Sequence, residues 1–238
     1  MNLTHFYYML IPALVSVTGG VLALIWQPSR YIRSLIQHFA AGVVLAALAV
    51  ELFPEISREH ANPWALLAAF ALGTLFMFVL KVFTEWLEAN EEPHADTLSK
   101  GLLIATFIDI AVDGFIIGAG FAAGGETGSV LALGLSVEIL FLGLALTSAN
   151  SQGWHIVLIT TALGLTVLLF AFLGNWLLMG ASNHVIASAL AFSAAALLYL
   201  VTEELLIEAH EVEEKPSSML ILFGGFLVFW AIQLLGAA

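Results

Sequence analysis

The chain contains no cysteine among its 238 residues, and only six residues are lysine or arginine. The missing thiols exclude disulfides, thiolate metal sites and cysteine nucleophiles. Eighteen acidic residues outnumber the basic ones and give a net charge of −12. This balance argues against nucleic acid and anionic lipid headgroups as partners, and it favours cations.

Charge of either sign is scarce, at 10% of the residues, whereas 61% are hydrophobic and the mean hydropathy is +1.02. A soluble domain needs more charge on its surface, so the composition predicts an all-α polytopic membrane protein. A spanning helix takes about 20 apolar residues. The sequence therefore predicts one transmembrane domain, residues 1–238, with eight helices at 7–26, 35–56, 64–86, 101–123, 129–148, 156–178, 184–207 and 219–235.

The basic residues predict the orientation. Five of the six lie in or beside the odd-numbered loops, namely Arg30, Arg33, Lys81, Lys100 and Lys215. Because cytoplasmic loops carry an excess of lysine and arginine, both termini are predicted to lie outside. The short loops and small size favour a prokaryotic inner membrane, with the lipid bilayer as a partner. The sequence is compatible with a monomer and with a homodimer.

An internal repeat relates the second and seventh spans. The stretch FAAGVVLAALAVELFPE begins at Phe39, and FSAAALLYLVTEELLIE begins at Phe192. In this register Glu51 falls on Glu204. The two spans run in opposite directions, so spans 1–3 and 6–8 are predicted to be inverted repeats that flank spans 4 and 5 in a 3+2+3 arrangement. That arrangement is typical of secondary transporters with a midplane site, although shared composition alone is the alternative explanation.

Acidic residues lie deep in two adjacent spans. The fourth span reads FIDIAVDGFIIGAG, with Asp109 and Asp113, and the fifth reads ALGLSVEILFLGLA, with Glu138. An acid at the bilayer centre costs roughly 3 kcal/mol, so a partner, water or an ion is expected beside it. Asp113 should lie about 18 Å from one surface and Glu138 about 14 Å from the other. Their depths are thus similar, with Asp109 one turn away on the same helix face.

Further acids lie above and below this level. Glu51 lies near the predicted outer end of the second span, and Glu203 and Glu204 near the inner end of the seventh. Carboxylates at several depths are what a route for cations or protons needs. Because Glu203 and Glu204 are about 100° apart on a helix, at most one should face such a route, and the repeat favours Glu204. Structural hydrogen bonds are the alternative role for the buried acids.

These motifs resemble the ZIP family of divalent metal transporters over almost the whole chain. Glu51-Leu-Phe-Pro54-Glu55 is similar to the end of the family's second span. The stretches LLYLVTEELLIEAH and MLILFGGFLVFW resemble its seventh and last spans. The family's fourth and fifth spans usually carry His-Asn-x-Pro-Glu-Gly and His-x-x-Pro-Glu-Gly. Here Asp113 and Glu138 take the histidine positions, Ile117 and Leu142 replace the glutamates, and both prolines are missing.

The resemblance implies a transporter that moves a divalent metal cation (Zn, Mn or Fe) toward the cytoplasm. The implied metal-binding residues are Asp113 and Glu138 centrally, Asp109, Glu203 and Glu204 on the inner side, and Glu51 at the outer side. A site of carboxylates suits harder ions such as Mn²⁺ better than zinc. The substituted ligands favour an alternative, a non-transporting relative that acts as a metal sensor or partner subunit. An intramembrane hydrolase with two aspartates has no supporting motif, so no enzymatic activity is expected.

Overall fold

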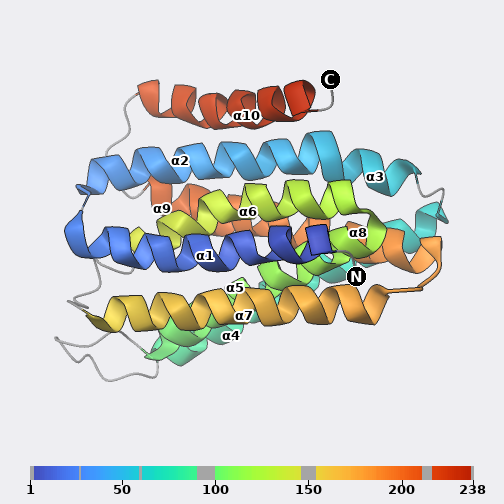
Figure 1. Ribbon diagram of the computed structural model, residues 1–238, viewed down its shortest axis with the longest axis horizontal. Coiled ribbons are helices and arrows are strands. Elements are labelled where there is room, and N and C mark those ends of the chain that lie inside the picture. The colour runs from blue at the N-terminus through green and yellow to red at the C-terminus, as the bar shows by residue number, and fades with distance from the viewer. Residues whose placement is uncertain are drawn as a thin grey trace.

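The computed structural model describes residues 3–26, 28–58, 61–89, 100–145, 154–210 and 216–236. Within these ranges the regular structure is entirely helical. Eight helical segments are long and apolar enough to cross a membrane, and they lie roughly side by side (Figure 1). The prediction of an all-α polytopic membrane protein is confirmed.

The second and seventh spans are each built from three consecutive segments, with a short π-helix between two α-helices. The elements in chain order are α1 (Leu3–Ile25), α2 (Arg30–Ala47), η1 (Leu48–Leu52), α3 (Phe53–Arg58), α4 (Pro63–Ala89), α5 (Lys100–Ala123), α6 (Gly125–Ala145), α7 (Trp154–Leu178), α8 (Asn183–Leu200), η3 (Val201–Leu205), α9 (Leu206–His210) and α10 (Pro216–Gly236).

Three helices begin four or five residues earlier than the sequence predicts: α1 at Leu3, α2 at Arg30 and α6 at Gly125. The hydroxyl of Ser29 caps α2 by accepting a hydrogen bond from the first turn. Glu126 lies in the first turn of α6, where a negative charge is favourable. Only Gly124 separates α5 from α6, so residues 125–128 belong to the helix of the fifth span. The predicted end of the fifth span, at residue 148, lies outside the described residues.

The helices form two groups of four. In one group α1 packs on α6 and α7, and α5 packs on the same two helices. In the other, α2 pairs with α10 and α4 pairs with α8, and the second and seventh spans meet through η3 and α9 (Figure 1). A two-fold relation would exchange the first three spans with the last three, and α5 with α6. Under this exchange the α2–α10 contact corresponds to the α8–α4 contact, and the α1–α6 contact corresponds to the α7–α5 contact. The contact pattern therefore has the predicted two-fold relation.

The two π-helices strengthen this relation. The chain runs from α2 to α3 in one direction and from α8 to α9 in the opposite one (Figure 1). Glu51 is the fourth residue of η1, and Glu204 is the fourth residue of η3. A π-helix is rare and occurs frequently at functional sites. The aligned acids of the sequence repeat thus have the same backbone environment.

Close backbone contacts join each outer helix to its neighbour. A Cβ added at Gly225 of α10 would lie 2.2 Å from the carbonyl oxygen of Phe39 in α2. A Cβ added at Gly73 of α4 would lie 2.5 Å from the carbonyl oxygen of Phe192 in α8. Phe39 and Phe192 are the first residues of the aligned repeat stretches. Small residues at such positions let membrane helices approach closely, and here both halves use the same contact.

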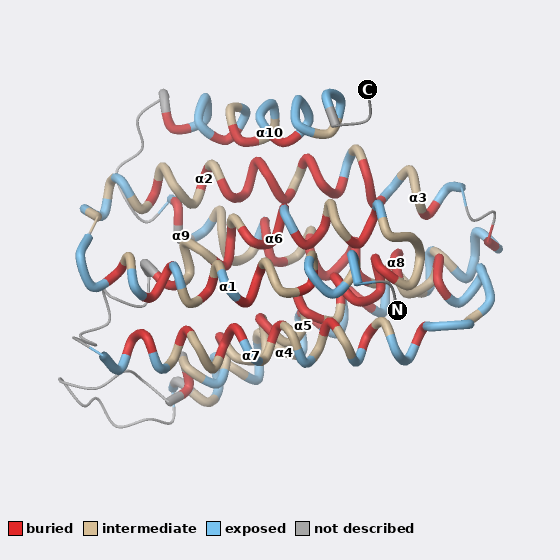
Figure 2. The backbone as a smooth tube through the Cα atoms, in the orientation of Figure 1, coloured by how far each residue is buried: buried red, intermediate tan, exposed pale blue. Residues whose placement is uncertain are grey.

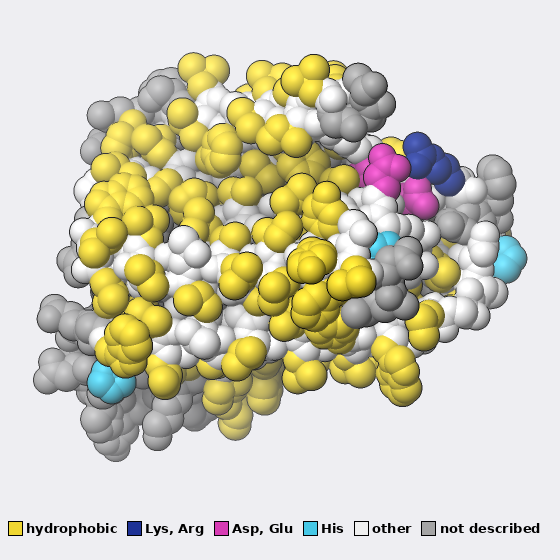
Figure 3. Space-filling model, viewed as in Figure 1, with side chains coloured by type: hydrophobic (Ala, Val, Ile, Leu, Met, Phe, Trp, Pro, Cys, Tyr) yellow, Lys and Arg dark blue, Asp and Glu magenta, His cyan; other side chains and the backbone are white. Residues whose placement is uncertain are grey.

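The outer helices α4 and α10 are the least covered, with 11% and 22% of their spanning windows buried, against 61% for the second span (Figure 2). Hydrophobic side chains cover most of the face shown in Figure 3. Exposed tryptophans lie near both ends of two helices: Trp64 and Trp86 on α4, and Trp154 and Trp176 on α7. These surfaces are suited to contact with lipid tails.

Candidate functional site

Two acids lie within the group formed by α1, α5, α6 and α7. Asp113 of α5 is 1% exposed, and Glu138 of α6 is 7% exposed. Asp109, one turn before Asp113, is half-buried. Because α5 packs on α6, adjacent helices of one group carry two of the buried predicted acids.

Asp113 and Glu138 also have equivalent backbone surroundings. A Cβ added at Gly174 of α7 would lie 2.7 Å from the carbonyl oxygen of Phe115, two residues after the first acid. A Cβ added at Gly19 of α1 would lie 2.6 Å from the carbonyl oxygen of Leu140, two residues after the second acid. The two-fold relation therefore extends to the central spans, and it places the two acids at matching positions.

Asp113 is buried without full compensation by the surrounding protein. Its Oδ1 atom has no hydrogen-bond partner among the described residues. The charge of Glu204, from the other helix group, acts on it. Like charges repel, so this arrangement favours a cation or a proton beside Asp113. Asp113 lies in α5 and Glu204 in η3, and α5 packs on α8, the helix that precedes η3.

Glu203 has a different environment from its neighbour. Its carboxylate lies 2.5 Å from the Nζ atom of Lys81 on α4, and the two side chains are 42% and 27% exposed. Glu203 therefore faces the outer helix, and Glu204 is the acid whose charge acts on Asp113. The two adjacent glutamates thus have different charged neighbours on different helices.

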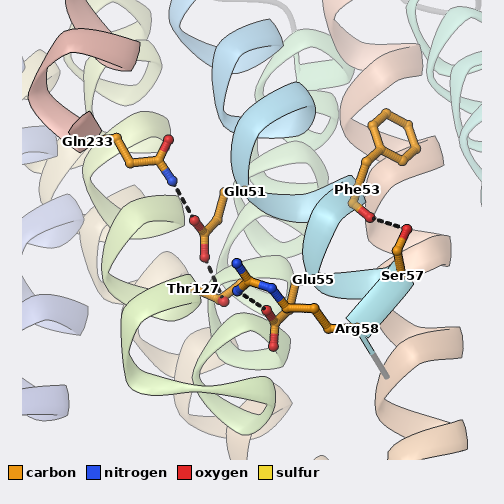
Figure 4. Close-up of polar contacts among 7 residues, drawn as sticks. All are labelled: Glu51, Phe53, Glu55, Ser57, Arg58, Thr127 and Gln233. Carbon is orange, nitrogen blue, oxygen red and sulfur yellow. Dashed lines mark hydrogen bonds and ion pairs between the residues drawn. The ribbon is translucent and has the colours of Figure 1, made fainter. Parts of the chain in front are cut away.

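Glu51 lies between the two helix groups at the other end of the molecule. The hydroxyl of Thr127 on α6 donates to Oε1 at 2.8 Å, and the amide of Gln233 on α10 donates to Oε2 at 2.7 Å (Figure 4). The side chain is 6% exposed. Nearby, Glu55 pairs with Arg58 at 3.1 Å. Both oxygens of Glu51 are thus held by neutral donors, and the Thr127 bond joins α6 to η1.

Gln233 and Lys81 occupy related places in the two halves. Gln233 follows Gly225 by eight residues, and Lys81 follows Gly73 by the same number. Each donates to a glutamate in the π-helix of the neighbouring span. Neither Thr127 nor Gln233 is predicted as a site residue from the sequence. An alignment of the third and eighth spans would have matched the amide of Gln233, in an otherwise apolar segment, to the amine of Lys81.

Four of the six predicted acids have distinct neighbours. Asp113 and Glu204 interact across the two helix groups, Glu203 binds Lys81, and Glu51 is held by Thr127 and Gln233. Among the described residues, no three or more histidine, aspartate or glutamate side chains lie close enough together to hold one metal ion.

No model of a known protein family matches the chain, and no curated protein matches it. The features available for assigning a function are therefore the buried acids, the repeat and the helix packing.

Proposed function

We propose that this protein is a transporter of divalent metal cations that moves metal toward the cytoplasm past carboxylates near the bilayer midplane. The observation that carries the proposal is Asp113. This acid is almost completely buried in a spanning helix, has a carboxylate oxygen with no hydrogen-bond partner among the described residues, and experiences the charge of Glu204. An intramembrane acid is costly unless a partner or an ion compensates it.

The surrounding residues support a cation at this position. The basic residue of the spans nearest to these acids, Lys81, is engaged by Glu203. Glu138, at the position equivalent to Asp113, supplies a second buried carboxylate from the adjacent helix. Asp113 and Glu138 would be the central ligands of the cargo, Asp109 and Glu204 would take part on the inner side, and Glu51 would guard the outer entry. Zn²⁺, Mn²⁺ and Fe²⁺ are the candidate cargoes, and the oxygen ligands favour the harder Mn²⁺.

The two-fold relation supports transport in preference to a purely structural role. Inverted repeats in secondary transporters allow the same site to face either side of the membrane in turn. Here the acids Asp113 and Glu204 come from different helix groups, so movement of one group against the other would change the distance between them. That change would let the site bind the cation in one state and release it in another.

A second candidate is a non-transporting relative that acts as a metal sensor or partner subunit. It is favoured by the finding that no three potential ligands converge among the described residues. This candidate predicts metal binding without movement of metal across the membrane.

The test is uptake of Zn²⁺, Mn²⁺, Fe²⁺ and Cd²⁺ into liposomes that contain the purified protein. Asp113→Asn and Glu138→Gln remove one buried charge each at nearly constant volume, and both are expected to abolish uptake. Glu85→Gln, at an exposed acid on α4, is the matched control and should leave uptake unchanged. Binding without uptake would favour the sensor or partner subunit. Unchanged uptake in both central variants would overturn the proposed site.

A further inference from the structure

The hydroxyl of Ser193 is buried in the middle of the seventh span. Ser193 belongs to α8 and is 0% exposed, and its Oγ atom has no hydrogen-bond partner in the part of the chain that the structure describes. Two other hydroxyls of this span bond to their own helix. Ser188 donates to the carbonyl oxygen of His184 at 2.8 Å, and Thr202 donates to that of Leu198 at 2.9 Å. Serine in a helix commonly makes this bond, and Ser193 does not.

The other half of the molecule shows that helix packing does not require this hydroxyl. In the aligned repeat, Ser193 follows Phe192 as Ala40 follows Phe39. Ala40 is 1% exposed, and the carbonyl oxygens of Phe39 and Phe192 have the same close contact with a glycine of the outer helix. A buried hydroxyl without a partner lowers stability. The second half thus carries a polar atom where the first half is apolar, and this points to a role other than folding.

The hydroxyl lies on the side of α8 that is turned away from the outer helix α4. Phe192 and Ala195 form the contact with Gly73 of α4. Successive helical residues are about 100° apart, so Ser193 lies about 130° around α8 from the middle of that contact. Elsewhere α8 packs on α5 and η1, and it continues into η3. Ser193 therefore faces the interior, among the elements that carry Asp113, Glu51 and Glu204.

Ser193 and Asp113 lie equally far along two helices that are packed on each other. Ser193 follows the start of α8 by ten positions, and Asp113 precedes the end of α5 by ten. Both of these helix ends belong to the side predicted to be outer, and each residue is about 15 Å from its helix end. Oδ1 of Asp113 likewise has no hydrogen-bond partner among the described residues. Two such oxygen atoms are thus buried deep within adjacent spans.

A hydroxyl oxygen suits the cation class that the central carboxylates favour. Hard divalent ions such as Mn²⁺ prefer oxygen ligands. A route for ions must bind its cargo favourably enough for entry and weakly enough for release. A neutral oxygen adds a ligand without adding another negative charge near Asp113 and Glu138, so it increases binding less than a further carboxylate would.

We propose that the Ser193 hydroxyl is a further ligand of the transported cation, a neutral oxygen that binds a hard divalent ion as it passes the central acids. The inference rests on the proposed function and adds one binding residue to it. Because Ala40 takes the equivalent place in the second span, this ligand belongs to the second half of the molecule alone.

The first experiment uses the absence of cysteine from the chain. Ser193→Cys introduces a single thiol, and Cd²⁺ added to the full chain in lipid nanodiscs should give the ultraviolet charge-transfer band of a Cd²⁺–thiolate bond, since soft metal ions bind thiolates directly. Excess Mn²⁺ should reduce the band. The matched control is Ser188→Cys, whose native hydroxyl bonds within its own helix. It should give no band at the Cd²⁺ concentration that saturates Ser193→Cys.

The second variant, Ser193→Ala, copies the first half of the molecule. It should weaken Mn²⁺ binding by at least about tenfold, because losing even an outer-shell partner costs roughly 10- to 100-fold in metal affinity. Uptake into liposomes should fall as well, while the midpoint of unfolding in detergent stays the same or rises. A purely structural hydroxyl would instead give a lower midpoint. Ser188→Ala should leave binding and uptake unchanged.

The outcomes separate this inference from the proposed function. A folded Ser193→Cys variant without the band would overturn the ligand assignment. Unchanged Mn²⁺ binding in Ser193→Ala would also overturn it, and this result decides the matter should the cysteine variant fail to fold. A Cd²⁺–thiolate band in a protein whose wild type takes up no metal would contradict transport and leave the ligand assignment standing.

Discussion

The two halves of the molecule share a backbone plan but use it differently at the π-helices. In the first half, Gln233 donates to Glu51, and Thr127 supplies a second donor. In the second half, Lys81 donates to Glu203, the residue before the acid aligned with Glu51. The equivalent donor therefore engages the aligned acid in one half and its neighbour in the other.

In the second half, two adjacent residues therefore divide two roles between them. One residue contacts the outer helix, and the other acts on the central acid. Glu51 has both oxygens bound by neutral groups and joins η1 to α6 and α10. Glu203 takes over the contact with the outer helix, and Glu204 is left to act on Asp113. The comparison teaches that an additional glutamate, Glu203, provides the contact with the outer helix in the second half. The first half has Val50 at the corresponding place.

The largest expected effect tests whether the halves share their packing. Gly225→Ala would place a methyl group 2.2 Å from the Phe39 carbonyl oxygen and should destabilise the protein by about 1–3 kcal/mol. Gly73→Ala should cost a similar amount in the other half, where the distance is 2.5 Å. Unfolding in detergent micelles measures both.

The adjacent Gly224 provides the control for this pair, because a Cβ there meets nothing within 4 Å. Gly224→Ala should stabilise α10 by up to about 1 kcal/mol, since alanine is the better helix former. Equal stability of the Gly224 and Gly225 variants would contradict the close contact. A large loss in one half alone would break the comparison.

The next effect concerns Glu51. Gln233→Leu removes one of its two donors, and a hydrogen bond to a charged group contributes about 1.5–3 kcal/mol. The stability of the folded protein should fall by about this amount, as measured by the same unfolding assay. Gln233→Lys introduces the chemistry of the second half and should retain most of the stability. If the leucine and lysine variants behave alike, the Gln233 bond does not stabilise the fold.

The smallest effect is expected at Lys81. The Lys81–Glu203 pair is partly exposed, so Lys81→Gln should cost no more than about 1 kcal/mol. Adding Glu203→Val, which copies the first half, should remove the remaining dependence on residue 81. A double-mutant cycle measures the coupling between the two residues. A coupling near zero would show that the pair does not orient Glu203.

The fold was largely predictable from the sequence because its signals are local. Long apolar segments predict the spans, and the aligned stretches from Phe39 and Phe192 predict the repeat. The early start of α6 at Gly125 was missed, because two glycines and a glutamate resemble a turn unless helix-dipole effects are considered. The π-helices were also missed, since one additional residue in a helical turn leaves no change in composition.

The site was predictable only in part, for a different reason. The burial of Asp113 and Glu138 follows from their positions within spans. The partners of Glu51 and Glu203 depend on which helices pack together, and Thr127 lies 76 positions from Glu51 along the chain. The burial of Ser193 likewise depends on how α8 packs between its neighbours. Residue spacing carries no direct signal of such contacts.

The exposed tryptophans have a consequence for the membrane itself. Trp64 and Trp86 are 22 positions apart on α4, and Trp154 and Trp176 have the same separation on α7. At about 1.5 Å per residue each pair spans about 33 Å, and tryptophan prefers the headgroup level. The tryptophan pairs on these two helices thus indicate the same hydrophobic thickness. A bilayer a few ångströms thinner would create a mismatch that both helices must relieve by tilting, so lipid chain length should bias the arrangement of the helix groups.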